Sequence, residues 1–152
     1  MRDSPAVPTL GRVDAEHLTA VLRRAIDEGP PLRLALVFGS AARGTARPGS
    51  DVDVAIIPVD SNLELREELD LAARCSAACG REVDLVRLDR ATPVLRWEAA
   101  RSHLLLLADP PHELPRFLAR AALDHADMAP LLDDCQRRFR RRLSEGNETE
   151  AP

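Results

Sequence analysis

The chain has 152 residues, which is enough for one domain with a helical appendage, and its hydrophobic fraction of 45% allows a sizeable core. The net charge of −4 argues against a protein whose main task is to coat nucleic acid, so we expect no stable DNA binding. Because the sequence has no stretch resembling a signal peptide, no apolar run long enough to cross a bilayer and no disulfide framework among its three cysteines, we expect a cytoplasmic protein that does not bind membranes.

The first half of the chain predicts one helix and two strands. Asp14 can cap the helix, whose apolar residues recur at helical spacing until the breaker Gly29-Pro30-Pro31. Residues 32–38 and 52–59 are apolar enough to form buried strands. A loop over residues 44–50, which contains a Pro-Gly turn signal, separates the two strands.

The next stretch predicts a helix followed by a strand. Asn62 can cap a helix that carries Leu65 and Leu69, and Gly80 is placed to form its C-terminal cap. Residues 82–88 then read as a third strand.

The last third of the chain is mainly helical. Thr92-Pro93 opens a short helix, because proline is favoured in the first helical turn, and residues 104–107 form a fourth strand. Beyond Pro110-Pro111 the apolar spacing is purely helical, and Pro130 is expected to break or kink the pattern. After that proline the apolar stripe resumes with four residues: Leu132, Cys135, Phe139 and Leu143.

Together these elements predict an α+β fold, with a small mixed sheet of about four strands flanked by helices and a C-terminal helical tail. We divide the chain into an N-terminal helix over residues 1–31 and a core over residues 32–108. C-terminal helices are expected over residues 109–143, and a disordered tail over residues 144–152.

The end of the first strand has the features of a phosphate-binding turn. At Gly39-Ser40 the absent side chain and the small hydroxyl would let a triphosphate approach backbone N–H groups. A short helix that follows would direct its N-terminus at the same phosphates, and Arg43 could add a fork of donors suited to phosphate oxygens.

Three carboxylates are expected to lie near this turn. Asp51 and Asp53 are two residues apart at the start of a strand, so their side chains leave the same face. Asp84 interrupts the apolar run of the third strand, and it would join them if the two strands were neighbours. Carboxylates that repel one another are explained most economically by hard divalent cations, so we predict a site for two Mg²⁺ ions.

This combination resembles the signature of the DNA polymerase β-like nucleotidyltransferase superfamily. Gly39-Ser40 is followed, after a ten-residue gap, by Asp51-x-Asp53, and the residues around both match the minimal nucleotidyltransferase branch. The chain length, the strand Glu82–Val86 and the segment Pro93–Glu98 are similar to the MntA antitoxins within that branch. The resemblance covers roughly residues 32–108.

The resemblance implies an activity and a partner. Proteins of this kind are antitoxins that transfer AMP from ATP to a tyrosine of a cognate HepT-type ribonuclease of the HEPN family, and thereby neutralise it. The chain is accordingly expected to be an enzyme that uses ATP as its substrate, and to form a hetero-oligomer with the toxin.

The resemblance also implies roles for individual residues. Asp51 and Asp53 would hold both metal ions, and Asp84 would complete one metal site and help to deprotonate the acceptor hydroxyl. The phosphates would be held by Gly39 and Ser40. The triphosphate or the loop would be supported by Arg43 and Ser50.

Two alternatives remain open from the sequence. One is an enzyme of the same fold that acts on a small molecule such as an aminoglycoside, although such enzymes generally need a longer chain to form an acceptor pocket. The other is an antitoxin that acts by occlusion and no longer catalyses transfer, against which the three intact carboxylates argue.

Overall fold

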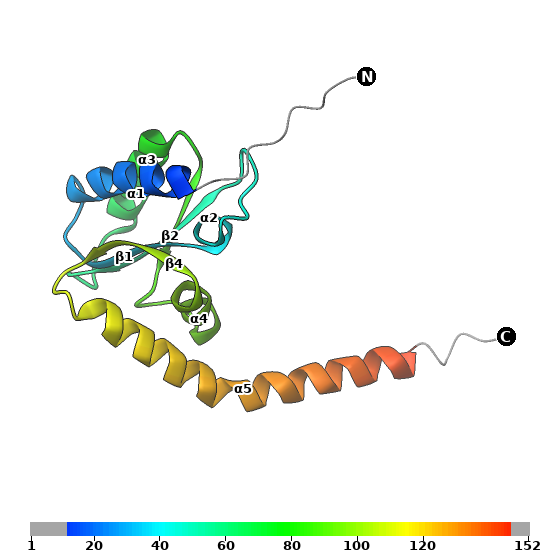
Figure 1. Cartoon of the computed structure of the whole chain (residues 1–152). Helices are drawn as coiled ribbons and strands as arrows, with labels where there is room; N and C mark the ends of the chain where they lie inside the picture. Colours follow the sequence, from blue (N-terminus) through cyan, green and yellow to red (C-terminus); the bar gives the residue numbers. More distant parts are fainter. Residues whose placement is uncertain (1–11, 147–152) are drawn as a thin grey trace, which may run out of the picture.

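A computed structural model describes residues 12–146 as a four-stranded mixed sheet with helices on both faces (Figure 1). The predicted α+β class and its small mixed sheet are confirmed. In chain order the elements are α1 (Arg12–Asp27), β1 (Leu32–Phe38), α2 (Gly39–Arg43), β2 (Val52–Pro58), α3 (Leu65–Cys79), β3 (Val83–Arg87), α4 (Pro93–Arg101), β4 (His103–Ala108) and α5 (Glu113–Gly146).

The sheet has the strand order β3-β2-β1-β4. β1 is antiparallel to both of its neighbours, whereas β2 and β3 are parallel. Phe38, the last residue of β1, therefore lies opposite Asp53 near the start of β2 and opposite His103 at the start of β4. One end of the sheet thus collects the end of β1 and the beginnings of the other three strands. We call it the carboxylate edge, because Asp53 and Asp84 lie there.

Each face of the sheet supports its own apolar cluster. On one face α1 and α3 pack against the sheet, with Leu22, Leu71 and Cys75 almost fully buried. Burial, with a smaller contribution from Cys79, raises the pKa of Cys75 to about 11, so this thiol is a packing group and not a reactive one. On the other face α4 and the first half of α5 cover the sheet, with Phe117 buried against it (Figure 1).

Helix α3 departs from the sequence prediction at its start and in its buried face. It begins at Leu65 after the N-cap Glu64, which forms a reciprocal capping box with Glu67, so Asn62 does not cap it. The backbone N–H of Asn62 instead donates to a side-chain oxygen of Asp60 in the preceding turn, 2.9 Å away. The helix therefore starts later than expected, and the position of each residue around the helix cannot be counted from Asn62.

The two leucines noted on α3 from the sequence do not form its buried face. Leu65 and Leu69 are 69% and 60% exposed, whereas Leu71 and Cys75 form the buried face. At the other end of the helix the prediction is confirmed, because Gly80 caps α3 with a φ of +66° in the left-handed region.

The first helix starts earlier than its expected cap. α1 begins at Arg12, so Asp14 lies inside its first turn and not at the N-cap position. α4 begins as predicted, since Thr92 accepts a hydrogen bond from the backbone N–H of Leu95 and Pro93 occupies the first turn.

Helix α5 runs through Pro130 without a break, so of the break or kink expected there only a kink is observed. Figure 1 shows that the helix changes direction midway and that its second half extends away from the rest of the protein. Trp97 of α4 stacks on His125 of α5 with ring centroids 4.6 Å apart, which joins the two helices. No helix among residues 12–146 is both long enough and apolar enough to cross a membrane.

Helix α5 extends further toward the C-terminus than the sequence predicts. Ser144–Gly146, assigned to a disordered tail from the sequence, belong to α5, whereas residues 147–152 lie outside the described part. Residues 1–11, assigned from the sequence to the N-terminal helix segment, also lie outside it.

Candidate functional site

The turn after β1 brings a glycine against a carboxylate. Gly39 has a φ of +68°, and a Cβ atom added to it would lie 2.3 Å from Oδ2 of Asp53. No other residue type fits here unless the Asp53 side chain moves. The sequence assigns Gly39 to the approach of phosphates, and the structure adds a second reason for glycine at this position. Ser40 follows in α2, where its carbonyl oxygen accepts hydrogen bonds that close the short helix.

Asp53 and Asp84 lie directly opposite each other on adjacent strands. They are partners in the parallel register of β2 and β3, as the sequence predicted they would be if the strands were neighbours. The Asp53 side chain is half-buried, and Asp84 is exposed. Asp51 is also exposed and stands immediately before β2.

Three charged groups act on the Asp53 carboxylate. Burial raises the pKa of Asp53, the negative charges of Asp84 and Asp51 raise it further, and the positive charge of Arg43 opposes them. Asp53 therefore carries repulsion that a single arginine does not cancel. A bound cation would relieve it.

The donor set at this edge fits Mg²⁺, which binds through carboxylate oxygens together with substrate phosphates. Asp51, Asp53 and Asp84 supply carboxylates from two neighbouring strands and the residue just before one of them. Within residues 12–146 no three His, Cys, Asp or Glu side chains are grouped so that they could hold a metal ion. Asp53 and Asp84 are neighbours across two strands, and the three carboxylates do not form a ready-made metal site.

The loop before Asp51 is held by several hydrogen bonds. Ser50 Oγ accepts from the backbone N–H of Arg47 at 2.9 Å, and the backbone N–H of Ser50 donates back to the carbonyl of Arg47 at 3.0 Å. Ser50 thus stabilises the loop, which is one of the two roles expected for it. Its part in binding a triphosphate stays a prediction, as does that of Arg43, which is exposed in the last turn of α2.

Arg81 is a residue of this site that the sequence did not reveal. It lies between α3 and β3, and its Nε donates to the carbonyl oxygen of Ser50 at 2.9 Å. Its Nη2 donates to the same oxygen. The guanidinium group therefore fixes the peptide that leads into Asp51. A contact between residues 31 positions apart leaves no local signal in the sequence.

The comparisons with known proteins agree with this geometry. The family described as polymerase beta, nucleotidyltransferase matches residues 22–111, which is more than half of the chain. The protein adenylyltransferase MntA of Shewanella oneidensis is 35% identical over 75 residues, which are 49% of this chain and 53% of that protein. The match thus spans about half the length of that curated relative. The resemblance inferred from the Gly39–Asp53 segment is confirmed.

Solved structures extend the likeness to most of the chain. A crystal structure of a toxin–antitoxin with AMP-PNP is similar with a TM-score of 0.63 at 26% identity, covering 81% of this chain and 98% of that one. A mutant MntA–HpeT toxin–antitoxin matches with a TM-score of 0.63 at 25% identity, covering 80% and 98%. A tri-AMPylated HEPN toxin of Shewanella oneidensis in complex with MNT antitoxin matches with a TM-score of 0.59, covering 80% and 98%, but at 22% identity that likeness shows the fold alone.

Proposed function

The chain belongs to the polymerase β nucleotidyltransferase family, and we propose that it is an antitoxin that transfers AMP from ATP to a hydroxyl group of a HEPN-type ribonuclease toxin. The relative named above as a protein adenylyltransferase and the similar toxin–antitoxin structure with AMP-PNP support this choice of reaction and partner. The acceptor would be a tyrosine of a HepT-like toxin, with which the chain would form a complex in the cytoplasm. Neutralisation of the toxin would follow from its modification.

One observation carries the proposal. Asp53 and Asp84 are register partners on adjacent strands, at the edge of the sheet where Gly39 leaves room for the Asp53 carboxylate. With Asp51, two residues before Asp53, these carboxylates are the kind of donors that phosphoryl transfer with two divalent cations requires.

Each residue of the site then has a chemical task. Asp51, Asp53 and Asp84 would hold Mg²⁺, which when bound neutralises charge on the phosphates. The acceptor hydroxyl oxygen would form a bond to the α-phosphorus of ATP while the bond to the bridging oxygen breaks and pyrophosphate leaves. The hydroxyl proton would pass to the Asp84 carboxylate.

The remaining site residues would position ATP. The backbone at Gly39 and Ser40 is short of side-chain bulk and can approach the phosphates. Arg43, whose charge already acts on Asp53, would donate to phosphate oxygens. Ser50 would act through the loop that it stabilises.

The second half of α5 supports a protein as the acceptor. Phe117 and Cys135 are 18 residues apart, as are Ala121 and Phe139, which equals five helical turns. The face that buries Phe117 and Ala121 against the domain therefore continues along the distal half of the helix. There it is uncovered: Phe117 is 3% exposed, whereas Phe139 is 64% exposed.

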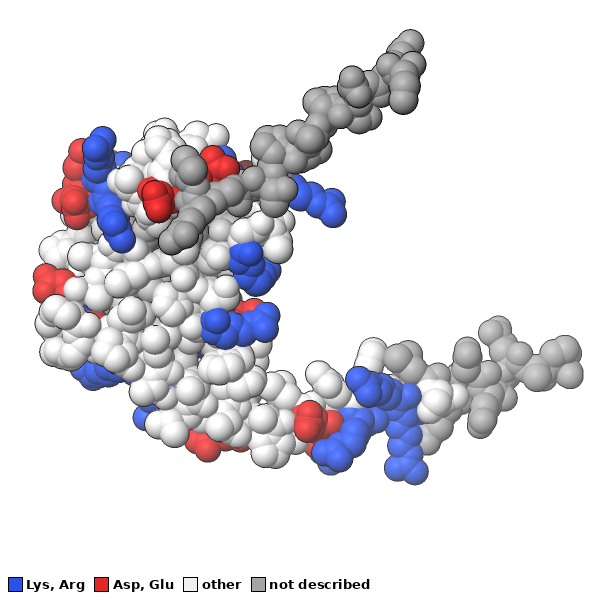
Figure 2. Space-filling view, in the orientation of Figure 1, with Lys and Arg blue, Asp and Glu red and all other residues white. Residues whose placement is uncertain are grey.

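The charge around this uncovered face is positive. Five exposed arginines lie on the distal half of α5, where Figure 2 shows basic side chains gathered: Arg137, Arg138, Arg140, Arg141 and Arg142. Figure 2 also shows a hollow between the domain and this half of the helix. An apolar helical face with a basic border is suited to a helical protein that carries acidic groups. The toxin is the partner we propose for it.

Labelled ATP tests the proposal. The protein is incubated with ATP labelled on the α-phosphate, Mg²⁺ and the cognate toxin, and the toxin is then assayed for label and for ribonuclease activity. We expect label on the toxin and loss of ribonuclease activity. Inhibition without label would instead indicate occlusion, and label transferred to an aminoglycoside but not to the toxin would indicate a small-molecule enzyme.

The Asp84→Ala variant tests the role of the base. Loss of a positioned base lowers the rate by about 10²–10⁴-fold, while the affinity for ATP should change only a few-fold. Glu82→Ala is the matched control, because it removes an exposed carboxylate beside the site that has no role in the proposed chemistry. Normal turnover in Asp84→Ala would contradict the proposed role of Asp84.

A further inference from the structure

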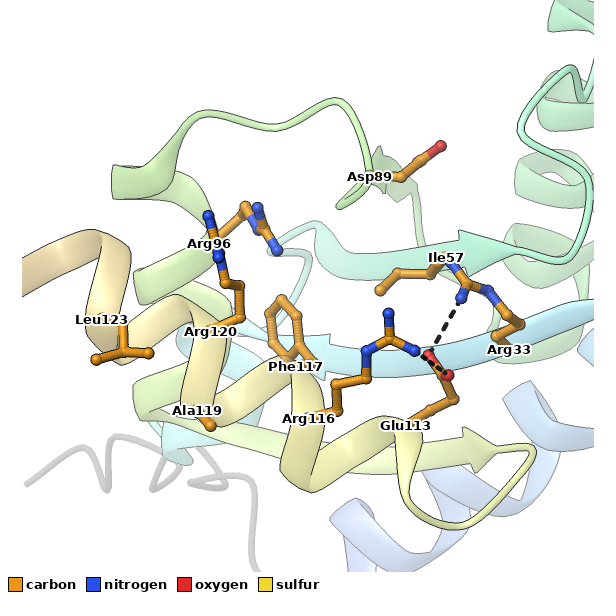
Figure 3. Close-up of a pocket in the computed structure, with 10 residues that line it drawn as sticks. All are labelled: Arg33, Ile57, Asp89, Arg96, Glu113, Arg116, Phe117, Ala119, Arg120 and Leu123. Atoms are coloured by element: carbon orange, nitrogen blue, oxygen red, sulfur yellow. Dashed lines mark ion pairs between the residues drawn. The ribbon is translucent and has the colours of Figure 1, made fainter.

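A groove lies between the first turns of α5 and the end of the sheet opposite the carboxylate edge. Its cavity volume is about 600 Å³, and Ile57 and Phe117 contribute apolar lining (Figure 3). Small-molecule sites typically have volumes of about 300–1,000 Å³. Ile57 is four residues beyond Asp53 on β2, which is about 13 Å along a strand. The groove is therefore separate from the proposed catalytic site.

Two arginines of the groove share one buried carboxylate. Arg33 Nη1 and Arg116 Nη1 lie 3.6 and 3.5 Å from carboxylate oxygens of Glu113, as the dashed lines in Figure 3 show. A charge-assisted hydrogen bond is shorter, at about 2.7–2.9 Å. Glu113 thus orients both guanidinium groups without occupying most of their donors. The Arg116 side chain, 69% exposed, keeps those donors accessible.

A second pair of arginines is arranged in the same way. Arg96 from α4 and Arg120 from α5 line the groove, and both form ion pairs with Asp124, at 3.5 and 2.9 Å. The Arg120 side chain is 68% exposed. A guanidinium group has five N–H donors, so one shared carboxylate leaves most of the donors of this pair available as well.

The groove has more positive than negative charge. We call Arg33, Arg96, Arg116 and Arg120 the groove arginines. Four arginines less the two carboxylates of Glu113 and Asp124 leave an excess of two positive charges, in a chain whose net charge is −4. Asp89 also lines the groove, and Arg87 binds its carboxylate with hydrogen bonds of 2.9 and 2.6 Å but also pairs with Glu68 at 2.6 Å, so this group adds one negative charge beside the groove. Each arginine pair, counted with the carboxylate that it shares, keeps one positive charge.

We propose that this groove binds a small molecule with two phosphate groups, such as a nucleoside diphosphate, with one phosphate at each arginine pair. The planar fork of arginine donates to phosphate oxygens in a bidentate manner, and a phosphate can accept from two guanidinium groups at once. This site does not depend on the proposed transfer reaction, because it shares none of its residues.

Binding of ADP to the full chain in buffer with EDTA tests the proposal. Calorimetry gives the affinity and stoichiometry, and the fluorescence of Trp97, the only tryptophan and the neighbour of Arg96, gives an independent signal. The Arg116→Gln/Arg120→Gln variant removes two exposed groove charges. The Arg24→Gln/Arg66→Gln variant is the matched control, with the same change in charge at two exposed arginines of α1 and α3 that do not line the groove.

We expect one ADP to bind at the groove, with an affinity at least tenfold weaker in the groove variant and within twofold of the parent in the control. Thermal unfolding verifies that both variants are folded. Equal ADP affinity in parent and groove variant would overturn the proposal, and so would an equal loss in the control. If the groove variant binds ADP normally but loses the toxin, the groove is a protein interface and the proposal is wrong. Failure of AMP transfer in the parent would refute the proposed function and leave this result unaffected.

Discussion

The Asp53 carboxylate occupies the space that a side chain on Gly39 would need, since a Cβ atom there would lie 2.3 Å from Asp53 Oδ2. Gly39 also has a φ of +68°, a conformation in which L-residues with a side chain are strained. Backbone strain and displacement of Asp53 are thus two separate consequences of one substitution. A second glycine allows them to be measured apart.

Gly39→Ala should lower both stability and AMP transfer. Strain in the left-handed region costs about 1–2 kcal/mol, and displacement of Asp53 should reduce the transfer rate by at least tenfold. Gly49→Ala is the control, because Gly49 has a φ of +79° but nothing within 4 Å of an added Cβ atom. It should lose similar stability in urea unfolding and retain transfer. Equal activity in the two variants would show that the contact with Asp53 does not matter.

Asp51→Asn and Asp53→Asn should each abolish transfer and leave the fold intact. The pKa of Asp53 is raised by burial and then by Asp84 and Asp51, so removal of one charge relieves repulsion. In metal-free buffer the melting temperature of Asp53→Asn should equal or exceed that of the parent, while transfer falls by orders of magnitude. Near-normal transfer by either variant would refute the metal assignment.

Arg81→Met should weaken transfer through the loop that leads into Asp51. Without two hydrogen bonds to the carbonyl of Ser50, that loop is less well fixed. We expect a higher Mg²⁺ concentration for half-maximal transfer, by about tenfold, a change of about 1.4 kcal/mol. Arg90→Met is the control, because Arg90 donates to a different backbone carbonyl, that of Ser61. An unchanged Mg²⁺ dependence in Arg81→Met would exclude this positioning role.

Asp89 should make stability depend on pH in acid. Hydrogen bonding from Arg87 lowers the pKa of Asp89 below its usual value, although burial opposes this. A carboxylate with a lowered pKa in the folded state contributes stability that is complete above its unfolded pKa of about 3.9 and is lost as the pH falls further. Asp89→Asn should therefore be less stable than the parent in urea at pH 7, with a difference that shrinks below pH 4. A difference that grows in acid would contradict this assignment.

Truncation after Pro130 should separate folding from recognition of the toxin. Phe117 and Ala121, in the first half of α5, are buried in the core, whereas Phe139 is 64% exposed. The shortened protein should stay folded and bind ATP, yet lose affinity for the toxin and labelling of it. In the full chain, Phe139→Asp should have the same effect. Normal labelling by both would place docking elsewhere, and unfolding of the truncated chain would show that the distal half belongs to the core.

How far the sequence predicts this protein depends on whether a signal is local. Gly39, Asp51 and Asp53 fall within 15 residues, so the turn and the paired carboxylates can be recognised directly. The register of Asp53 with Asp84 needed only the further assumption that their strands are neighbours. By contrast, the clamp from Arg81 to Ser50 joins separate loops, and no spacing rule reports it.

The buried face of a helix is also hard to predict from local sequence signals alone. The sequence placed Leu65 and Leu69 on the apolar side of α3, but the capping box of Glu64 and Glu67 sets the start of the helix, and Leu71 faces the core instead. The groove arginines come from one strand and two helices, so only the tertiary structure brings them together.

Because α5 is one continuous helix, its length fixes where the uncovered face lies and which way it points. Each residue of an α-helix adds about 1.5 Å and about 100° of rotation. One residue inserted between Phe117 and Phe139 would turn the uncovered face by about a quarter of a circle and move it along the axis. An insertion or deletion within the helix would therefore disturb this face more than an exchange of similar exposed residues would. The number of residues in α5 would therefore set the distance between the domain and a toxin bound to the distal half of the helix.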